Sequence, residues 1–510
     1  MRNQEIHAAL EYHEATKHSE RSLRANRHVL DFSNQPLPFK IYRDLEAIPL
    51  PRNLAESDWS ALDAIAATGS PGSGECIPDL AVLGRILFLS AGITKRKRYP
   101  GGEILFRAYP NTGALYHLDL YLVAGDLPGL EAGVYHFGPH DFALHRLRSG
   151  DFRSVLFEAS GENPDVARAP VVLASASTYW RNAWKYQARS YRHCYWDGGT
   201  LHANLLAAAE TEALEPRIVM GFADAAVETL LALDPRREAV LTLVPLGRSP
   251  KLPPPRAPVS TLRLHTEPLS RVEVDYPAVR SLHEASALTT GEEARAWRSQ
   301  AMPARAEASS QRETTSLRPV ALSHASLDRV IQKRGSTRAF DSTRSLRFEE
   351  LSTALDRATR GLAADFLVPG ASLVDLYLIV HSVDGVAPGA YVYRRRERAL
   401  EPLREGVFRG PAGRLGLFQE LAAEASVNVY SLAPLTPLLK RFGNRGYRAA
   451  QLEGGVTGGR LYLAAYALGF GATGLTFLDD EVTEFFSPHA AGKSALFLTA
   501  LGRADRTRRS

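Results

Sequence analysis

This sequence contains few cysteines and has a small net charge. Its 510 residues include two cysteines, Cys76 and Cys194, and no Cys-x-x-Cys motif. A disulfide framework is therefore excluded, and a cysteine-based zinc site is not expected. The 61 Lys and Arg residues exceed the 56 Asp and Glu residues by a formal net charge of only +5. Spread over this length, that excess does not indicate a nucleic-acid-binding protein.

Long apolar segments are also missing. The first residues, MRNQEIHAALEYHEATKHSERS, are polar and lack the apolar stretch of about 7 to 15 residues that a secretory signal requires. The uncharged run 461–478 approaches the length of a membrane span, but it contains Gly469, Gly471 and Gly474. We interpret it as a buried helix followed by a glycine-rich turn. We expect a cytoplasmic protein without a membrane or nucleic-acid partner.

The sequence contains enough apolar residues to form a large core, and it contains a long internal repeat. Hydrophobic residues make up 45% of the chain. Segment 118–137 aligns without gaps on segment 374–393, with seven identical positions of twenty. The same 256-residue offset aligns SYRHCYWDGG (190–199) with GYRAAQLEGG (446–455), and each copy closes with Leu-Gly-Arg. A period this long indicates a duplicated domain.

Each copy has the element order of an α+β domain. A helical stretch precedes alternating apolar strands, a long apolar helix (201–214 and 461–468) and a terminal strand. We predict an N-terminal extension (1–55), a first domain (56–250), a connector (251–320) and a second domain (321–510) that form a pseudo-dimer within one chain. The connector begins with SPKLPPPRAP and has room for one or two helices.

The two copies differ in the residues that could bind a ligand. KRGSTRAFD (333–341) places Arg334, Ser336 and Arg338 at alternate positions of an extended segment, where they suit a phosphate dianion; an alternative is a solvated basic loop. The first copy has no Lys or Arg between positions 53 and 84. Instead it has AYPNTGALYHLDLY (108–121), a turn suited to presenting backbone N–H groups to a flat ligand.

The order of these motifs resembles that of the FMN-dependent nitroreductase superfamily, specifically the SagB/ThcOx-type dehydrogenases that oxidise azolines to azoles in modified peptides. Arg-x-Ser-x-Arg before a helix, PNTGALYHLDLY before a hairpin and a C-terminal Leu-Gly-Arg carry the resemblance, which covers nearly the whole chain. It implies two nitroreductase-like domains with FMN held between them, a peptide or small-molecule substrate, and partner enzymes in natural-product biosynthesis. Monomer and homodimer both stay open.

The resemblance also implies which residues bind FMN. From the second copy it implies Arg334, Ser336, Arg338 and Arg503 at the phosphate, and backbone groups of Gly474, Leu475 and Thr476 near the ring. From the first copy it implies the turn Pro110, Asn111, Thr112 and Gly113 over the ring. Each copy keeps the half that the other has lost, so we predict one flavin site per chain.

A catalytic pair is implied in the first copy alone. Family members use a Lys-Tyr pair, which matches Lys185 and Tyr186, whereas the second copy has Arg441 and Phe442 at these positions. A lysine whose pKa is lowered by burial can act as a general base, with tyrosine relaying the proton. The alternative is a surface lysine beside a core tyrosine.

Two functions other than that of an FMN-dependent dehydrogenase stay open. The first is an NAD(P)H-dependent reductase of nitro compounds or quinones, and the second is a flavin-free scaffold that binds a partner. His193 and Cys194 lack further clustered ligands, and His117 suits a structural role, so we predict no metal site. Asp479, Asp480 and Glu481 suit the start of a helix.

Overall fold

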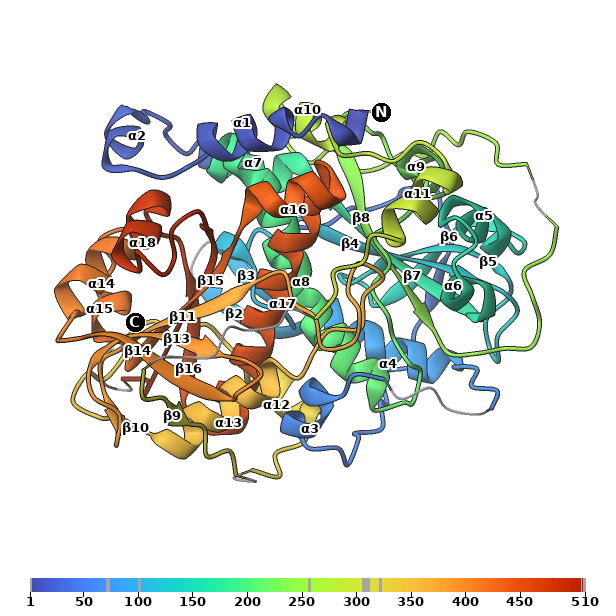
Figure 1. Ribbon diagram of the computed structural model, residues 1–510. Helices are drawn as coiled ribbons and strands as arrows, with labels where there is room; N and C mark the ends of the chain where they lie inside the picture. Colours follow the sequence, from blue (N-terminus) through green and yellow to red (C-terminus); the bar gives the residue numbers. More distant parts are fainter. Residues whose placement is uncertain are drawn as a thin grey trace.

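The computed structural model describes residues 2–69, 74–99, 102–255, 258–304, 312–320, 323–505 and 507. Two antiparallel sheets lie on either side of a pair of long helices, α8 (Ser190–Glu210) and α17 (Arg445–Ala467) (Figure 1). This arrangement confirms the predicted α+β class and the duplication.

Each sheet contains the same five strands in the same order. The first sheet has the order β1-β6-β5-β4-β7-β8, formed by Ala47–Pro49, Ala143–Ser149, Gly133–Gly138, Leu118–Ala124, Val171–Thr178 and Glu238–Leu246. The second has the order β16-β17-β15-β11-β13-β14-β9, formed by Gly471–Leu475, Ser494–Gly502, Val427–Ala433, Asp375–Val380, Gly389–Arg394, Ala399–Glu405 and Thr315–Ser316. The repeated segments 118–137 and 374–393 form β4-β5 and β11-β13, the centre of each sheet.

Shorter helices cover the two sheets. Around the first sheet lie α4 (Leu80–Ala91), α5 (Arg153–Ala159), α6 (Pro164–Arg168), α7 (Tyr179–Tyr186) and α9 (Asp224–Leu230), whereas α3 (Ala61–Ala66) packs on α8, α17 and the second copy's helices. Around the second lie α12 (Leu327–Lys333), α13 (Phe348–Ala358), α14 (Arg409–Leu415), α15 (Glu420–Glu424), α16 (Leu435–Phe442) and α18 (Asp479–Phe485). Side-chain caps start several of them; Asp79, for example, accepts a hydrogen bond from Val82 N at the start of α4.

The extension and the connector add short elements. The extension contributes α1 (His7–Ala15), α2 (Glu20–Ala25) and strand β1, and the described part of the connector contributes α10 (Pro277–Ala285), α11 (Gly291–Arg298) and strand β9. Two small sheets pair β2 (Ile93–Tyr99) with β3 (Gly102–Arg107), and β10 (Leu346–Arg347) with β12 (Val383–Asp384). The two connector helices agree with the predicted one or two.

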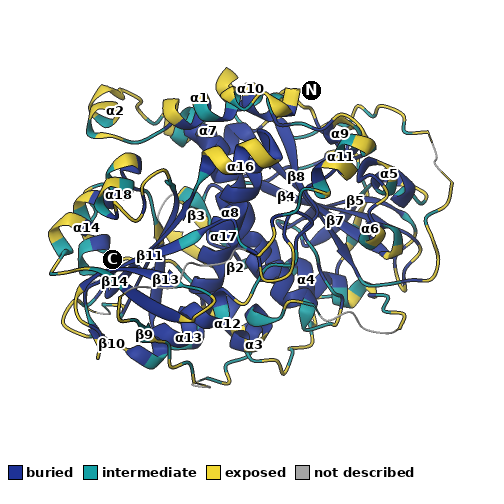
Figure 2. Ribbon diagram, viewed as in Figure 1, coloured by how far each residue is buried: buried dark blue, intermediate teal, exposed yellow. Residues whose placement is uncertain are grey.

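The central helices cross where the two repeats carry paired glycines. A Cβ atom on Gly199 of α8 would lie 2.5 Å from the carbonyl carbon of Gly455, and one on Gly455 of α17 would lie 3.0 Å from Gly199 Cα. The backbones therefore touch at this crossing, which only glycine permits. Both helices are buried along nearly their whole length (Figure 2).

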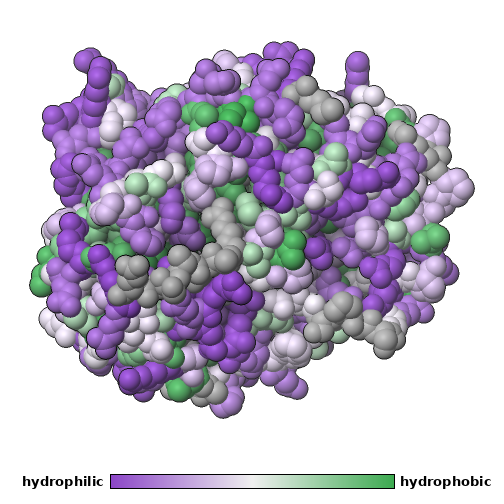
Figure 3. Space-filling view, viewed as in Figure 1, coloured by the Kyte–Doolittle hydropathy of each residue, from purple (hydrophilic) through white to green (hydrophobic). Residues whose placement is uncertain are grey.

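Two expectations about the apolar runs need correction. The long helices begin at Ser190 and Arg445, earlier than predicted, because the polar stretches SYRH and GYRA are already helical and buried. The glycine-rich segment after α17 is strand β16, paired with β17, and not a turn. No helix among the described residues is long and apolar enough to cross a bilayer. The face of the molecule in Figure 3 is mostly hydrophilic.

Candidate functional site

Backbone pairing brings the second copy's predicted binding residues together at one edge of its sheet. The extended segment before β10 lies along β16, where Thr337 N donates to Ala472 O at 2.9 Å. It also lies along the chain end, where Asp341 N donates to Arg503 O at 2.8 Å. Segments 334–338, 474–476 and Arg503 are therefore neighbours in space, although up to about 170 residues separate them in sequence.

Tyr462 connects two of these segments. The Tyr462 hydroxyl on α17 lies 3.2 Å from Ser336 Oγ and accepts a hydrogen bond from Gly474 N. Sequence reasoning did not single out this residue, because one tyrosine in an apolar helix looks like any core residue. Its contacts fix the Arg-x-Ser-x-Arg segment against β16.

The three arginines that were predicted to bind the phosphate have different surroundings. Arg334 is buried and donates to the carbonyl oxygens of Ala108 and Arg107 at 3.1 and 3.2 Å. Arg503 pairs with Glu350 at 2.6 Å. Arg338 is exposed and makes no hydrogen bond or ion pair with any residue that the structure describes. Arg338 is therefore the cation whose charge is available to an anion, while Arg334 fastens this segment to the first copy.

The residues that Arg334 contacts lead directly into the first copy's turn. Pro110 to Gly113 follow Ala108, and the buried carboxylate of Asp197 on α8 holds them in place. Asp197 accepts from Thr112 N, Thr112 Oγ1 and Asn111 Nδ2 at 2.7 to 3.0 Å. This explains the aspartate of the Asp-Gly-Gly repeat, and Glu453 plays the same part in the second copy by accepting from Leu373 N at 2.8 Å.

His117 and His193 have structural surroundings. His117 is fully buried, with Nδ1 at 2.8 Å from Ser177 Oγ and Nε2 at 2.9 Å from Asp197 Oδ2. His193 Nδ1 lies 2.7 Å from Asn182 Oδ1, and its ring packs on Trp196 at 5.0 Å. Neither imidazole is free to meet a substrate.

Lys185 and Tyr186 lie beside the turn. A Cβ atom on Gly113 would be 2.8 Å from the Tyr186 hydroxyl, so this glycine makes room for the tyrosine. Burial raises the pKa of Tyr186, which therefore keeps its proton at neutral pH. The Lys185 side chain is exposed and its Nζ lies 5.4 Å from the Tyr186 ring centroid. The pair is adjacent, but the described residues do not bury the lysine.

A row of aromatic rings joins this pair to the second copy. Tyr186 packs on His193 at 4.6 Å between ring centroids, and Trp196 packs on Phe477 and Phe497 at 5.9 Å each. Phe497 lies beneath Gly474, where an added Cβ would be 3.7 Å from its ring. These contacts connect the first copy's turn and the residues predicted as a catalytic pair with the second copy's β16.

The acidic run after β16 is the start of a helix, as the sequence predicted. Asp479 begins α18 and is buried against Arg192 at 2.5 Å and Arg189 at 3.0 Å. Burial opposes its ionisation, but the two guanidinium groups hold the pKa of Asp479 well below its usual range. These charges anchor α18 to α8 and the N-terminal extension.

One buried hydroxyl group at this site lacks a partner. Thr476 Oγ1 forms no hydrogen bond within the described parts of the chain. Buried polar atoms are normally satisfied, so an unpartnered one invites a ligand. Together with the unpaired charge of Arg338, it fits a ligand with acceptor oxygens and an anionic end.

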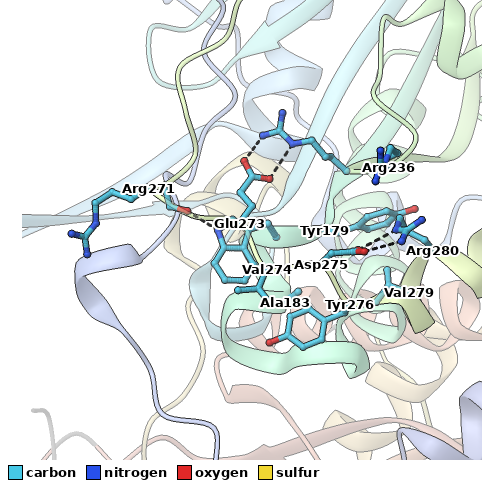
Figure 4. A pocket seen from close by; sticks show the side chains of 13 residues that line it. Tyr179, Ala183, Arg236, Arg271, Glu273, Val274, Asp275, Tyr276, Val279 and Arg280 are labelled. Carbon is cyan, nitrogen blue, oxygen red and sulfur yellow. Dashed lines mark hydrogen bonds and ion pairs between the residues drawn. The ribbon is translucent and has the colours of Figure 1, made fainter.

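A separate cavity of about 520 Å³ lies between α7 and the connector (Figure 4). Its lining includes Tyr179 and Ala183 of α7, and none of the predicted site residues. Arg237 pairs there with Glu273 and Arg280 with Asp275 at 2.7 Å, so acidic groups already neutralise two of its guanidinium groups.

Gln187, the residue after Lys185 and Tyr186, has a strained backbone. Gln187 adopts φ 51° and ψ −139°, and Gly443 occupies the equivalent position in the second copy with φ 67° and ψ −165°. Such a conformation costs a non-glycine residue roughly 1 to 3 kcal/mol. The strained turn sets the direction in which α7 ends and α8 begins.

We expect Gln187→Gly to raise the free energy of unfolding by about 1 kcal/mol, because strain relief exceeds the entropic cost of glycine. Chemical denaturation measures the change. Ala188→Gly is the control, since Ala188 has no left-handed backbone to relieve, and it should destabilise the protein by about 0.5 to 1 kcal/mol. Equal destabilisation by both variants would show that Gln187 is unstrained.

Comparison with known proteins gives concordant results. Residues 331–493 match the model described as "Nitroreductase family". "Putative nitroreductase MJ1384" of Methanocaldococcus jannaschii is 29% identical over 169 residues, 33% of this chain and 80% of that protein. "Trifolitoxin-processing protein TfxB" of Rhizobium leguminosarum bv. trifolii is 34% identical over 152 residues, 28% of this chain, and the match spans only 40% of TfxB.

One solved structure matches over both copies. The crystal structure of a "putative nitroreductase" from Anabaena variabilis ATCC 29413 superposes with a TM-score of 0.77 and 26% identity. The superposition covers 98% of this chain and 99% of the other. The two-sheet arrangement is therefore shared along the full length.

Proposed function

We propose that this protein is an FMN-dependent oxidoreductase with one composite flavin site per chain, a proposal that the match of residues 331–493 to the nitroreductase model supports. The observation that carries the proposal is the complementary placement of the two half-sites. Arg334 of the second copy donates to the carbonyl groups of Arg107 and Ala108, directly before the first copy's turn. The segment proposed to bind the phosphate and the turn proposed to cover the ring are therefore in contact, although they belong to different copies.

The residues present fit FMN. Arg338 and Ser336 offer a charge and a hydroxyl to the phosphate, with Arg503 beside them and partly neutralised by Glu350. Gly474, Leu475 and Thr476 border the ring from the second copy, with the unpartnered Thr476 hydroxyl as a further donor. Pro110, Asn111, Thr112 and Gly113 cover it from the first copy. FMN, when bound, supplies a two-electron acceptor for a substrate C–H bond.

The chain's own contribution to the chemistry is proton transfer. Lys185 Nζ is the proposed proton acceptor, and the Tyr186 hydroxyl, which keeps its proton, orients the substrate beside Gly113. A general base must be the neutral amine, which burial favours. Because Lys185 is exposed here, bound substrate has to provide that burial.

An azoline ring in a peptide is the proposed substrate, so the reaction removes two hydrogen atoms to give an azole. The match to a trifolitoxin-processing protein supports a peptide substrate, and partner enzymes that first form the azoline ring are part of the proposal. Incubation of the FMN-loaded protein with a synthetic thiazoline peptide in air should lower the peptide mass by two hydrogen atoms.

The exposure of Lys185 favours a second candidate, an NAD(P)H-dependent reductase of nitro compounds or quinones, which needs no such base. The two candidates differ in two measurements. Under the reductase proposal, NAD(P)H bleaches the flavin absorbance rapidly. Under the dehydrogenase proposal, NAD(P)H bleaches it slowly and the thiazoline peptide bleaches it under anaerobic conditions.

We expect Lys185→Ala to lower kcat for azoline oxidation by about 100- to 10,000-fold, which is the usual contribution of a positioned general base. The FMN content should be unchanged, because Lys185 is not among the residues proposed to bind the phosphate. Tyr186→Phe should have a smaller effect. Full turnover in Lys185→Ala would remove the base from the proposal and favour the reductase.

A further inference from the structure

Three potential metal ligands gather at the hairpin between β5 and β6, in the sheet of the first copy at the right of Figure 1. One ligand atom from each of His140, Asp141 and His145 lies within 4.8 Å of the others. Asp141 Oδ2 is 3.0 Å from His145 Nε2 and 3.7 Å from His140 Nε2. The two imidazole rings are almost parallel, with an interplanar angle of 5°.

These groups can lie close together because the neighbouring residue in the hairpin, Gly138, has no side chain. A Cβ atom on Gly138 would lie 2.8 Å from His145 Nε2 and closer still to Asp141 Oδ1. Any larger residue would push the carboxylate and the imidazole away from each other. The position of His145 is fixed further by strand pairing, since it lies opposite His136 of β5 and Ala47 of β1.

No lysine or arginine among the described residues pairs with the Asp141 carboxylate. The ion-pair partners of Asp141 among the described residues are the two histidines alone, and its Oδ1 is buried without a hydrogen bond. The Nδ1 atoms of both histidines are likewise buried and unpartnered.

A second triad in the same chain shows the contrast. Asp224, Glu228 and His283 are equally close to one another. There, however, Arg445 and Arg448 both bind the Asp224 carboxylate at 2.6 Å. These two cations satisfy the acidic group and repel a metal ion. In the hairpin triad the described arginine that contacts Asp141, Arg52, donates to its backbone carbonyl at 3.1 Å and not to the carboxylate.

We propose that His140, Asp141 and His145 bind one divalent transition-metal ion of the zinc type, with water as the fourth ligand. Metal–ligand bonds of about 2.0 to 2.1 Å in a tetrahedral site place neighbouring ligand atoms about 3.3 Å apart. The two separations from Asp141 Oδ2, 3.0 and 3.7 Å, lie on either side of that value, and the ligand atoms of the two histidines lie within 4.8 Å of each other. On binding, the metal replaces the hydrogen bond between His145 and Asp141.

The ion would fasten the hairpin and, through β6, the edge strand β1 of the N-terminal extension. Two imidazoles and one carboxylate favour zinc and its transition-metal neighbours over magnesium or calcium, which prefer oxygen ligands alone. The site is independent of the proposed flavin chemistry. Sequence reasoning missed it because a His-Asp pair followed by a histidine four residues later has no spacing typical of a zinc motif.

Isothermal titration of the full chain, without a histidine tag and after EDTA treatment and its removal, tests the site with zinc chloride and with magnesium chloride. We expect one zinc ion per chain, no magnesium binding, and a melting temperature that rises with zinc concentration. His140→Ala should weaken zinc binding by at least about tenfold. This variant retains the hydrogen bond between His145 and Asp141, so it should fold.

His265→Ala is the matched control, because His265 forms an exposed pair with Asp44 at 2.8 Å but has no third ligand. Zinc affinity should be the same in this variant as in the unmodified chain. Absence of zinc binding in the unmodified chain would overturn the proposal, as would equal affinity in His140→Ala. Measuring FMN content in the same samples keeps this result separate from the flavin proposal.

Discussion

Reversing the charge of Arg338 to glutamate is expected to abolish retention of FMN. Arg338 is exposed and forms no ion pair with the residues that the structure describes, so its charge is available to a phosphate. Loss of charge-assisted hydrogen bonds and added repulsion together cost about 3 kcal/mol or more, a loss of affinity on the order of 100-fold. Fluorescence titration of the apoprotein with FMN measures the change.

The control is Arg248 of the first copy, whose counterpart in the second copy is Arg503. Arg248, in the first Leu-Gly-Arg, pairs with Glu215 at 3.0 Å and donates to Gly74 O at 2.6 Å. Arg248→Glu should cost about 1 kcal/mol of folding stability at a part-exposed ion pair and leave FMN affinity unchanged. Equal loss of FMN in both variants would contradict a single composite site.

The second large effect is expected at the helix crossing. Gly455→Ala should destabilise the protein by about 3 kcal/mol or more, since the new Cβ would lie 3.0 Å from the Trp196 carbonyl carbon and from Gly199 Cα. Rigid backbone on both sides leaves no side chain that can move aside. Pulling α8 and α17 apart would also separate the two half-sites, so FMN affinity should fall together with the unfolding free energy.

The neighbouring glycine provides the control. A Cβ on Gly454 would be 3.5 Å or more from its nearest neighbours, an ordinary packing distance. Gly454→Ala should therefore be neutral or stabilise α17, because alanine is the better helix former by about 1 kcal/mol. Urea denaturation of both variants gives the comparison. Similar stability of the two variants would mean that the helices do not touch through Gly455.

Much of the fold could be predicted because the repeat compares the sequence with itself. Identical residues such as Tyr121 and Tyr377 align β4 with β11, and the alternation of apolar residues identifies strands in both copies. The α+β class follows from this order. The strand Gly471–Leu475 could not be predicted, because a segment rich in glycine is typical of a turn. In the structure this segment pairs with β17, and Gly474 N donates to the Tyr462 hydroxyl.

The candidate site was predictable in its segments but not in its contacts. Arg334, Ser336 and Arg338 look equivalent in sequence, yet one is tied to backbone carbonyls, one lies beside Tyr462 and one is exposed. The supporting Asp197 looked like part of a repeat motif without a stated role. These distinctions depend on tertiary neighbours 85 to 226 residues away in sequence, which no local pattern encodes.

The most direct test of the composite site is the amount of FMN bound per chain. The protein would be purified, loaded with excess FMN, separated from free flavin, and denatured to quantify the flavin released. We expect one FMN per chain, held between the second copy's Arg-x-Ser-x-Arg segment and the first copy's turn. Two FMN per chain would contradict the loss of the second site, and none would contradict the flavin function itself.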